Sequence, residues 1–120
     1  MKEDNLVADK SKAFAIRVIR LYQHLNTEKK EFVLSKQILR SGTSIGANVR
    51  EAISAQSKAD FIAKMQIALK EATETQYWLE LLTETGYITE KAGDSLFSDC
   101  QELVKLITTI LKTAKMNKSK

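Results

Sequence analysis

The feature that most constrains this chain is the near absence of residues that interrupt helices. Its 120 residues include no proline and only four glycines. A β-rich chain of this size needs turn residues at intervals of about 8–12 positions, and here they are missing. Hydrophobic residues make up 43% and charged residues 28%, which is typical of a folded protein and too apolar for disorder. The composition predicts a single domain, spanning residues 1–120, built from long helices.

Apolar residues recur at helical spacing in four segments. Steps of four and three residues separate Phe14, Val18, Leu21 and Leu25 in the first segment, and the other three repeat this pattern. We expect helices at about 9–25, 31–54, 58–85 and 89–114, followed by a basic tail at 115–120. Because the connections between them are short, the helices are predicted to form an antiparallel up-down-up-down four-helix bundle.

Two glycines lie one turn apart inside the second predicted helix. Gly42 and Gly46 each cost about 1 kcal/mol relative to alanine in a helix. A helix that keeps both is expected to use them for the close approach of a neighbour. On a helical wheel Gly46 falls beside Leu39 and Ile53, which suggests a second packing surface on that flank.

The other flank of the second helix is polar. It carries Arg40, Ser44, Asn48 and Glu51 at steps of four, four and three residues, and we call this set the polar seam. We interpret the seam as a network of hydrogen bonds within and between helices at the border of the core. The alternative is a ligand site.

The third predicted helix is apolar on two sides. One stripe, which includes Phe61, Met65 and Leu79, is expected to face the core. A second set, here called the outer stripe, consists of Ile67, Glu71, Glu74, Trp78 and Leu81. A helix on the outside of a monomer needs one apolar face, and monomers rarely expose a second. We therefore predict that the outer stripe, together with Gly46, forms an interface between copies of the chain. The alternative is that Trp78 borders the monomer core.

The charged residues are unevenly distributed. The formal net charge is +4, but residues 61–90 carry five acidic and two basic side chains. The candidate nucleic-acid contacts lie on the first and fourth helices: Lys10, Lys12, Arg17, Arg20, Lys105, Lys112 and Lys115. Such a surface permits contact with phosphates, and a solvated face is the alternative. We expect no aromatic residue to interleave this basic surface, so stacking on bases is not predicted.

The parts of a catalytic site are missing from the sequence. There is one histidine, His24, and one cysteine, Cys100, and neither a zinc-binding cysteine pair nor a phosphate-binding glycine loop is present. Cys100 falls in the apolar stripe of the fourth helix, which predicts a buried thiol rather than a nucleophile. Glu71 and Glu74 would face a metal only if symmetry brought copies together. We expect no enzymatic activity, no cofactor and no small-molecule substrate.

The sequence also bears on location. No apolar run approaches the ~20 residues of a membrane span, and the charged residues that follow Met1 do not resemble a secretory segment. A single cysteine forms no internal disulfide. We expect a cytoplasmic protein without a membrane partner.

Several short segments carry a family resemblance. They are Arg-Ser-Gly-Thr-Ser-Ile-Gly-Ala-Asn-Val-Arg-Glu-Ala at 40–52, Asp-Phe-Ile at 60–62, Ile-Ala-Leu-Lys-Glu-Ala at 67–72, Tyr-Trp-Leu at 77–79 and Gly-Tyr-Ile at 86–88. In these segments the chain resembles the four-helix-bundle proteins first noticed as reading frames in intervening sequences of large-subunit ribosomal RNA genes. The resemblance extends from about Leu6 to Leu111. One departure is Ala52, where many members have glycine, and it bears on the end of the second helix.

The resemblance implies a small bundle that assembles as a ring-like homopentamer. It also implies kinship with the accessory variability protein of diversity-generating retroelements, which works with a reverse transcriptase and nucleic acid. The biochemical role of most members is not established, and the label "ribosomal protein" reflects where the gene was first found. The expected partners are other copies of this chain and RNA or DNA. A protein–protein scaffold with no nucleic-acid role is the alternative.

Overall fold

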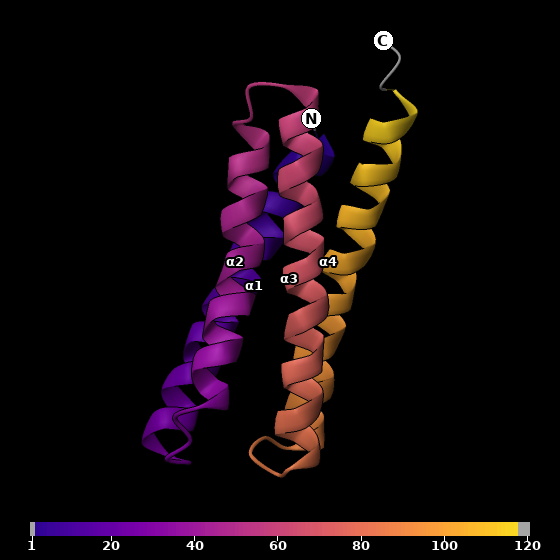
Figure 1. Ribbon diagram of the computed structural model, residues 1–120. Coiled ribbons are helices and arrows are strands. Elements are labelled where there is room, and N and C mark those ends of the chain that lie inside the picture. The colour runs from indigo at the N-terminus through magenta and orange to yellow at the C-terminus, as the bar shows by residue number, and fades with distance from the viewer. Residues whose placement is uncertain (1, 118–120) are drawn as a thin grey trace.

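The computed structural model describes residues 2–117, and four α-helices account for nearly all of them. The helices are α1 (Lys2–Thr27), α2 (Leu34–Ile53), α3 (Lys58–Glu84) and α4 (Glu90–Met116). They alternate in direction, and short loops join them at the two ends of the bundle (Figure 1). No strand occurs within residues 2–117. The predicted all-α, up-down-up-down architecture is confirmed.

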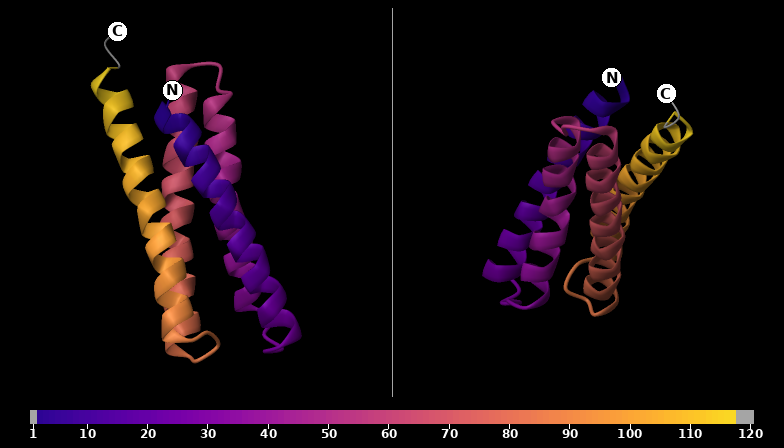
Figure 2. Two further views of the ribbon diagram at one scale, coloured as in Figure 1. Left: turned by 180° about the vertical axis from the view of Figure 1, so that it is seen from behind. Right: turned by 45° about the horizontal axis from the view of Figure 1, so that its top comes forward.

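The helices pack as a ring around one elongated core. Each helix contacts the next one in sequence, and α1 also contacts α4, which closes the ring. The α1–α4 contact is the least extensive of the four, and Figure 2 shows these two helices side by side from behind, with both termini at the same end of the bundle. The described chain measures 52 × 21 × 19 Å along its principal axes. None of its helices is both long enough and apolar enough to span a bilayer.

Side chains from all four helices fill the core. The largest fully buried ones are Phe14, Leu25, Ile38, Ile45, Met65, Leu79, Leu82, Leu103, Ile107, Val7, Val18 and Val49. Burial of each large aliphatic side chain stabilises the fold by about 1.5–3 kcal/mol. These residues are the inward positions of four amphipathic stripes, so the periodicity of the sequence specifies the interior.

Cys100 belongs to this core. Its side chain is fully buried, and its Sγ lies 3.3 Å from the carbonyl oxygen of Ala72. Burial, with a smaller contribution from the charge of Asp99, raises the pKa of the Cys100 thiol to about 12. The thiol therefore stays protonated near neutral pH and acts as a small apolar side chain, as the sequence predicts.

Two helix starts differ from prediction. α1 begins at Lys2 rather than near position 9, because fully buried Val7 extends the apolar stripe by two turns toward the N-terminus. α2 begins at Leu34 rather than near Glu31, because Glu31 lies outside the helix and caps it. The ends of α3 and α4 lie close to the predicted positions. Of the predicted basic tail, residues 118–120 lie outside the described part of the chain.

Glu31 replaces a conventional cap at the start of α2. Its carboxylate accepts hydrogen bonds from the backbone N–H groups of Ser35 at 2.7 Å, Leu34 at 3.0 Å and Val33 at 3.2 Å. Burial opposes ionisation of Glu31, but these hydrogen bonds together outweigh it and lower the pKa below its ordinary value of 4.5. The negative charge thus satisfies otherwise unpaired donors at the positive end of the helix.

Only one of the two glycines in α2 is required by close packing. A Cβ at Gly42 would lie 2.8 Å from both methyl carbons of Val18, whereas a Cβ at Gly46 would come no closer than 3.4 Å to Ser11. Both glycines face α1. The predicted close approach of a neighbouring helix is confirmed at Gly42, and Gly46 has room for a methyl group.

Candidate functional site

The polar seam of α2 meets the outer stripe of α3. Nη1 of Arg40 lies 3.0 Å from Oε1 of Glu71, and its Nη2 is paired with Oε2 of Glu74. The indole N–H of Trp78 donates to the same Glu74 oxygen at 3.0 Å. We call these four residues the Arg40 cluster. It brings together two sets of residues that were predicted separately.

The charges of the Arg40 cluster satisfy one another. The hydrogen bond from Trp78, followed by that from Arg40, lowers the pKa of Glu74. The hydrogen bond to Glu74 raises the pKa of Arg40. The Arg40 side chain is 50% exposed, whereas those of Glu71 and Glu74 are 13% and 29% exposed. The cluster therefore forms an ion-paired clamp at the rim between α2 and α3.

The glutamates of the cluster are directed toward an arginine. Among the side chains that the structure describes, no group of three or more histidine, cysteine, aspartate or glutamate residues is placed to hold a metal ion. The carboxylates of Glu71 and Glu74 instead contact the guanidinium of Arg40. Their hydrogen-bonding capacity in the single chain thus serves the packing of α2 against α3.

The rest of the polar seam also bonds within the chain. The hydroxyl of Ser44 donates to the carbonyl of Arg40 at 2.6 Å, and the amide of Asn48 donates to the carbonyl of Ser44 at 2.9 Å. Glu51 pairs with Lys64 of α3 at 3.3 Å. The seam is a network within α2 and between α2 and α3.

The outer stripe is partly covered and partly open. Ile67 is 40% exposed, while Trp78 is half-buried and packs against the core. The ring of Trp78 also lies beside that of Tyr77, which is 54% exposed, with 5.2 Å between the ring centroids. Trp78 therefore borders the monomer core and takes part in an exposed aromatic pair. Gly46 lies elsewhere, on the flank of α2 that faces α1.

The structure separates the predicted basic contacts into two groups. Lys10 pairs with Glu102 at 3.2 Å, and Arg17 pairs with Asp99 at 2.7 Å. These pairs link α1 to α4. The other predicted residues are exposed and form no ion pair among residues 2–117: Lys12, Arg20, Lys105, Lys112 and Lys115.

A cleft of about 950 Å³ lies between α1 and the loop that joins α3 to α4. Arg17, Arg20 and His24 line it from the C-terminal half of α1, Lys29 from the following loop and Tyr87 from the α3–α4 loop. Sequence reasoning missed His24, Lys29 and Tyr87 as a group because they belong to separate elements. The expectation that no aromatic residue accompanies the basic surface is corrected by Tyr87.

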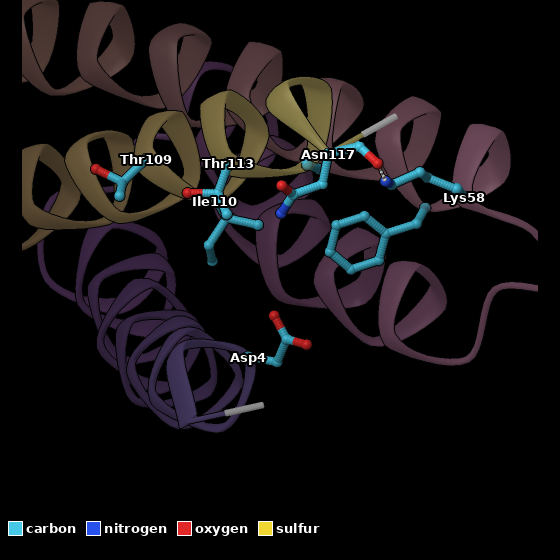
Figure 3. A pocket seen from close by; sticks show the side chains of 8 residues that line it. Asp4, Lys58, Thr109, Ile110, Thr113 and Asn117 are labelled. Atoms are coloured by element: carbon cyan, nitrogen blue, oxygen red, sulfur yellow. Dashed lines mark hydrogen bonds between the residues drawn. The ribbon is translucent and has the colours of Figure 1, made fainter. Parts of the chain in front are cut away.

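A smaller groove lies at the opposite end of the bundle. It has a volume of about 310 Å³, and Figure 3 shows Asp4 of α1 together with Ile110 and Thr113 of α4 around it. The Nζ of Lys58 donates to the backbone carbonyl of Asn117 at 2.5 Å beside the groove. This groove carries fewer basic side chains than the cleft.

The four-helix ring and its ion-paired seams place the chain among small up-and-down helical bundle proteins. Residues 3–109 match the model of the 23S rRNA-intervening sequence protein family, and the chain belongs to that family. The resemblance seen in residues 40–52 and the other short segments is confirmed.

A solved structure supports the same assignment. The chain is similar to a protein of unknown function from the S23 ribosomal protein family of Bacteroides thetaiotaomicron VPI-5482, with 61% sequence identity and a TM-score of 0.91. The match covers 92% of this chain and 98% of that one. No curated protein matches the chain. Because that relative is itself of unknown function, the role of this protein must be argued from its surface.

Proposed function

We propose that this protein is a non-enzymatic, homo-oligomeric bundle that binds nucleic acid through the exposed cations of α1 and α4. The observation that carries the proposal is that five of the seven predicted cations on these helices make no ion pair with a side chain that the structure describes. A cation that is not neutralised within its own chain is available to a phosphate. The family's link to a ribosomal RNA gene, which its name records, supports the same class of partner.

The hydroxyl and thiol groups of the chain support a non-enzymatic role. Thr43 and Ser44 donate to carbonyl oxygens of their own helix. Ser41 is buried and hydrogen bonded to Thr75 at 2.9 Å. Cys100 is buried as a protonated thiol. A nucleophile needs an adjacent base and access to its substrate, and none of these groups combines the two.

Salt dependence tests the nucleic-acid role. Contact through phosphates releases counterions, so the logarithm of the binding constant should fall linearly with the logarithm of salt concentration, by about 0.9 per phosphate contacted in duplex DNA and about 0.7 in a single strand. Filter binding or fluorescence anisotropy at several salt concentrations measures this slope. We expect binding at low salt with a steep slope. Absence of binding at low salt would exclude the proposal.

Assembly is the second part of the proposed function. Ile67 and the Tyr77–Trp78 pair leave apolar surface exposed on α3, and a second copy of the chain would cover it. The family resemblance implies a ring of five. We expect Trp78→Ala to lower the mass in light scattering while helicity by circular dichroism changes little. The control is Ile19→Ala, which removes a 41% exposed apolar side chain from α1. Equal masses for wild type and Trp78→Ala would exclude Trp78 as an interface anchor.

A protein–protein scaffold is the second candidate. The observation in its favour is the exposure of two apolar residues in the α1–α2 connection, Phe32 at 50% and Val33 at 70%. A scaffold would retain a specific protein partner after nuclease treatment. Under either function we place the protein in the cytoplasm, on the sequence argument of its single cysteine.

A further inference from the structure

We infer that the cleft between α1 and the α3–α4 loop holds an unpaired nucleotide of a single-stranded nucleic acid, with its phosphate on Arg20 and Lys29 and its base on Tyr87. The inference rests on the nucleic-acid role proposed above and names the site that performs it. At about 950 Å³, the cleft is within the range of ~300–1,000 Å³ typical of ligand sites.

The basic side chains that line the cleft are of two kinds: one is ion paired within the chain, and the others are free to contact a ligand. Arg17 is held by Asp99, and its guanidinium also approaches the hydroxyl of Ser95 at 3.2 Å. Arg20, His24 and Lys29 are exposed and make no side-chain hydrogen bond or ion pair among residues 2–117. An arginine fork and a lysine ammonium are both established phosphate ligands. The side chains available to a phosphate, Arg20 and Lys29, therefore come from α1 and from the loop that follows it.

Across the cleft lies the aromatic residue that a base requires. Tyr87 is half-buried and packs against the core, and buried Leu21, Ile88 and Leu96 line the cleft near it. Every base presents a π-face to an aromatic ring, so stacking tolerates any sequence. The arrangement of cations on one side and an aromatic ring on the other is the one used to bind single strands without sequence preference.

The α3–α4 loop is held in place and leaves room for a ligand. The backbone N–H groups of Tyr87 and Ile88 both donate to the carbonyl of Leu82, at 2.9 and 3.3 Å. Gly86 has a φ of +82°, and no atom lies within 4 Å of where its Cβ would be. A positive φ favours glycine, and the open space beside it admits a strand. The backbone of Tyr87 is thus held in place before the ligand arrives.

The position of the ring favours a single strand over a duplex. A half-buried ring in a cleft reaches a base only when that base has left its partner and its neighbours in the stack. One carboxylate, Glu90 in the first turn of α4, also lines the cleft and would repel a second phosphate nearby. A single nucleotide with its flanking backbone is the occupant that fits both features.

The stacking interaction can be observed directly. A single-stranded oligothymidylate with one central 2-aminopurine should lose fluorescence when the wild-type protein binds, because the base stacks on Tyr87. Tyr87→Phe should keep this quenching. Tyr87→Leu should abolish it and weaken binding on the order of tenfold, the size of effect that truncation of a stacking aromatic residue produces. A purely structural role for Tyr87 would change thermal stability without changing the quenching.

The phosphate contacts have a matched test. The double variant Arg20→Gln with Lys29→Gln should reduce the slope of the salt dependence by about 0.7, since the two side chains share one phosphate and each phosphate contacted in a single strand contributes about 0.7. The control is Lys36→Gln with Lys70→Gln, which removes the same formal charge from exposed positions of α2 and α3. All four side chains are exposed, so the fold is preserved in both double variants.

The outcomes separate this inference from the proposed function. The wild type could bind at about 50 mM salt without quenching, or with quenching that Tyr87→Leu does not abolish. Either result would exclude the cleft as the binding site and leave the nucleic-acid role in place. Equal salt slopes for the two double variants also overturn it. Failure of the wild type to bind overturns the proposed function itself. Tighter binding of a duplex or of a free mononucleotide than of the single strand would contradict a strand as the occupant.

Discussion

The contacts that α1 makes with α2 and with α4 differ in how closely the helices pack and in how many ion pairs join them. On the side of α1 that faces α2, the backbone of Gly42 lies close to the methyl groups of Val18. α2 is in turn joined to α3 by the ion pairs of the Arg40 cluster. Toward α4, the contact is less extensive and relies in part on ion pairs of half-exposed side chains such as Arg17. The α1–α4 side also borders the cleft of about 950 Å³.

The difference indicates which side is built for stability and which for contact with a partner. Where α2 packs against α3, Arg40 and Glu51 of α2 are both ion paired to side chains of α3. Along α1 and α4, cations in excess of their internal partners remain exposed. Binding residues are generally placed on the less constrained surface of a rigid scaffold. We therefore propose that the α2 side mainly stabilises the fold and that the α1–α4 side binds the partner.

The largest expected effect on stability concerns the contact between α1 and α2. Gly42→Ala places a methyl group 2.8 Å from Val18, and overpacking of this kind typically costs about 1–3 kcal/mol. Because alanine regains about 1 kcal/mol of helix propensity, we expect a net loss of up to about 2 kcal/mol in the free energy of unfolding. Urea denaturation measures it.

Gly46→Ala is the matched control in the same helix. Its Cβ would be 3.4 Å from Ser11, so we expect no loss and a gain of up to about 1 kcal/mol. Equal losses at the two positions would show that α2 packs as closely at Gly46 as at Gly42.

The next largest effect on stability is that of Glu31, which caps α2, and its contribution depends on pH. Since the folded-state pKa of Glu31 lies below 4.5, its ionised carboxylate stabilises the fold fully above pH 4.5, and this contribution is lost as the pH falls through the folded value. Glu31→Gln removes the charge, and we expect a loss of about 1 kcal/mol at pH 7. The difference from wild type should shrink in thermal unfolding below pH 4.5. A difference that is constant with pH would mean that the charge does not contribute.

The smallest effect compares the two kinds of ion pair. Arg40→Ala leaves Glu71, whose side chain is only 13% exposed, without its charged partner, and we expect a loss of about 1 kcal/mol. Arg17→Ala breaks a pair whose side chains are 39% and 48% exposed. Pairs of that exposure contribute little, so we expect a loss below about 0.5 kcal/mol. Chemical denaturation of both variants under the same conditions checks the order, and a larger loss for Arg17→Ala would reverse the comparison.

Periodicity was sufficient to predict the helices and their buried stripes. The spacing of Phe14, Val18 and Leu25 gives the inward face of α1, and the place of Cys100 in a similar stripe gives its burial. The start of α1 was missed because the charged and polar run at 2–5 precedes Val7 and hides the continuation of its stripe. The start of α2 was missed because Glu31 caps the helix from two residues before its N-cap, and the N-cap itself is Val33, where a short polar residue is usual.

The candidate site was harder to predict, for a physical reason. Pairing of Arg40 with Glu71 depends on the register of α2 against α3, which a helical wheel of either helix alone does not contain. The cleft depends on the packing of three separate segments, which bring Tyr87 close to Arg20 and Lys29. The sequences of α1 and α4 were sufficient to predict the basic residues, but only the fold shows that Tyr87 lies beside some of them.

One measurement tests the assignment of binding to the α1–α4 side most directly. A single strand that carries 4-thiouracil is crosslinked to the protein by light, and the modified peptides are identified by mass spectrometry. We predict crosslinks in the C-terminal half of α1 and in the α3–α4 loop, including Tyr87. Crosslinks confined to the α2–α3 face around Trp78 would contradict the account.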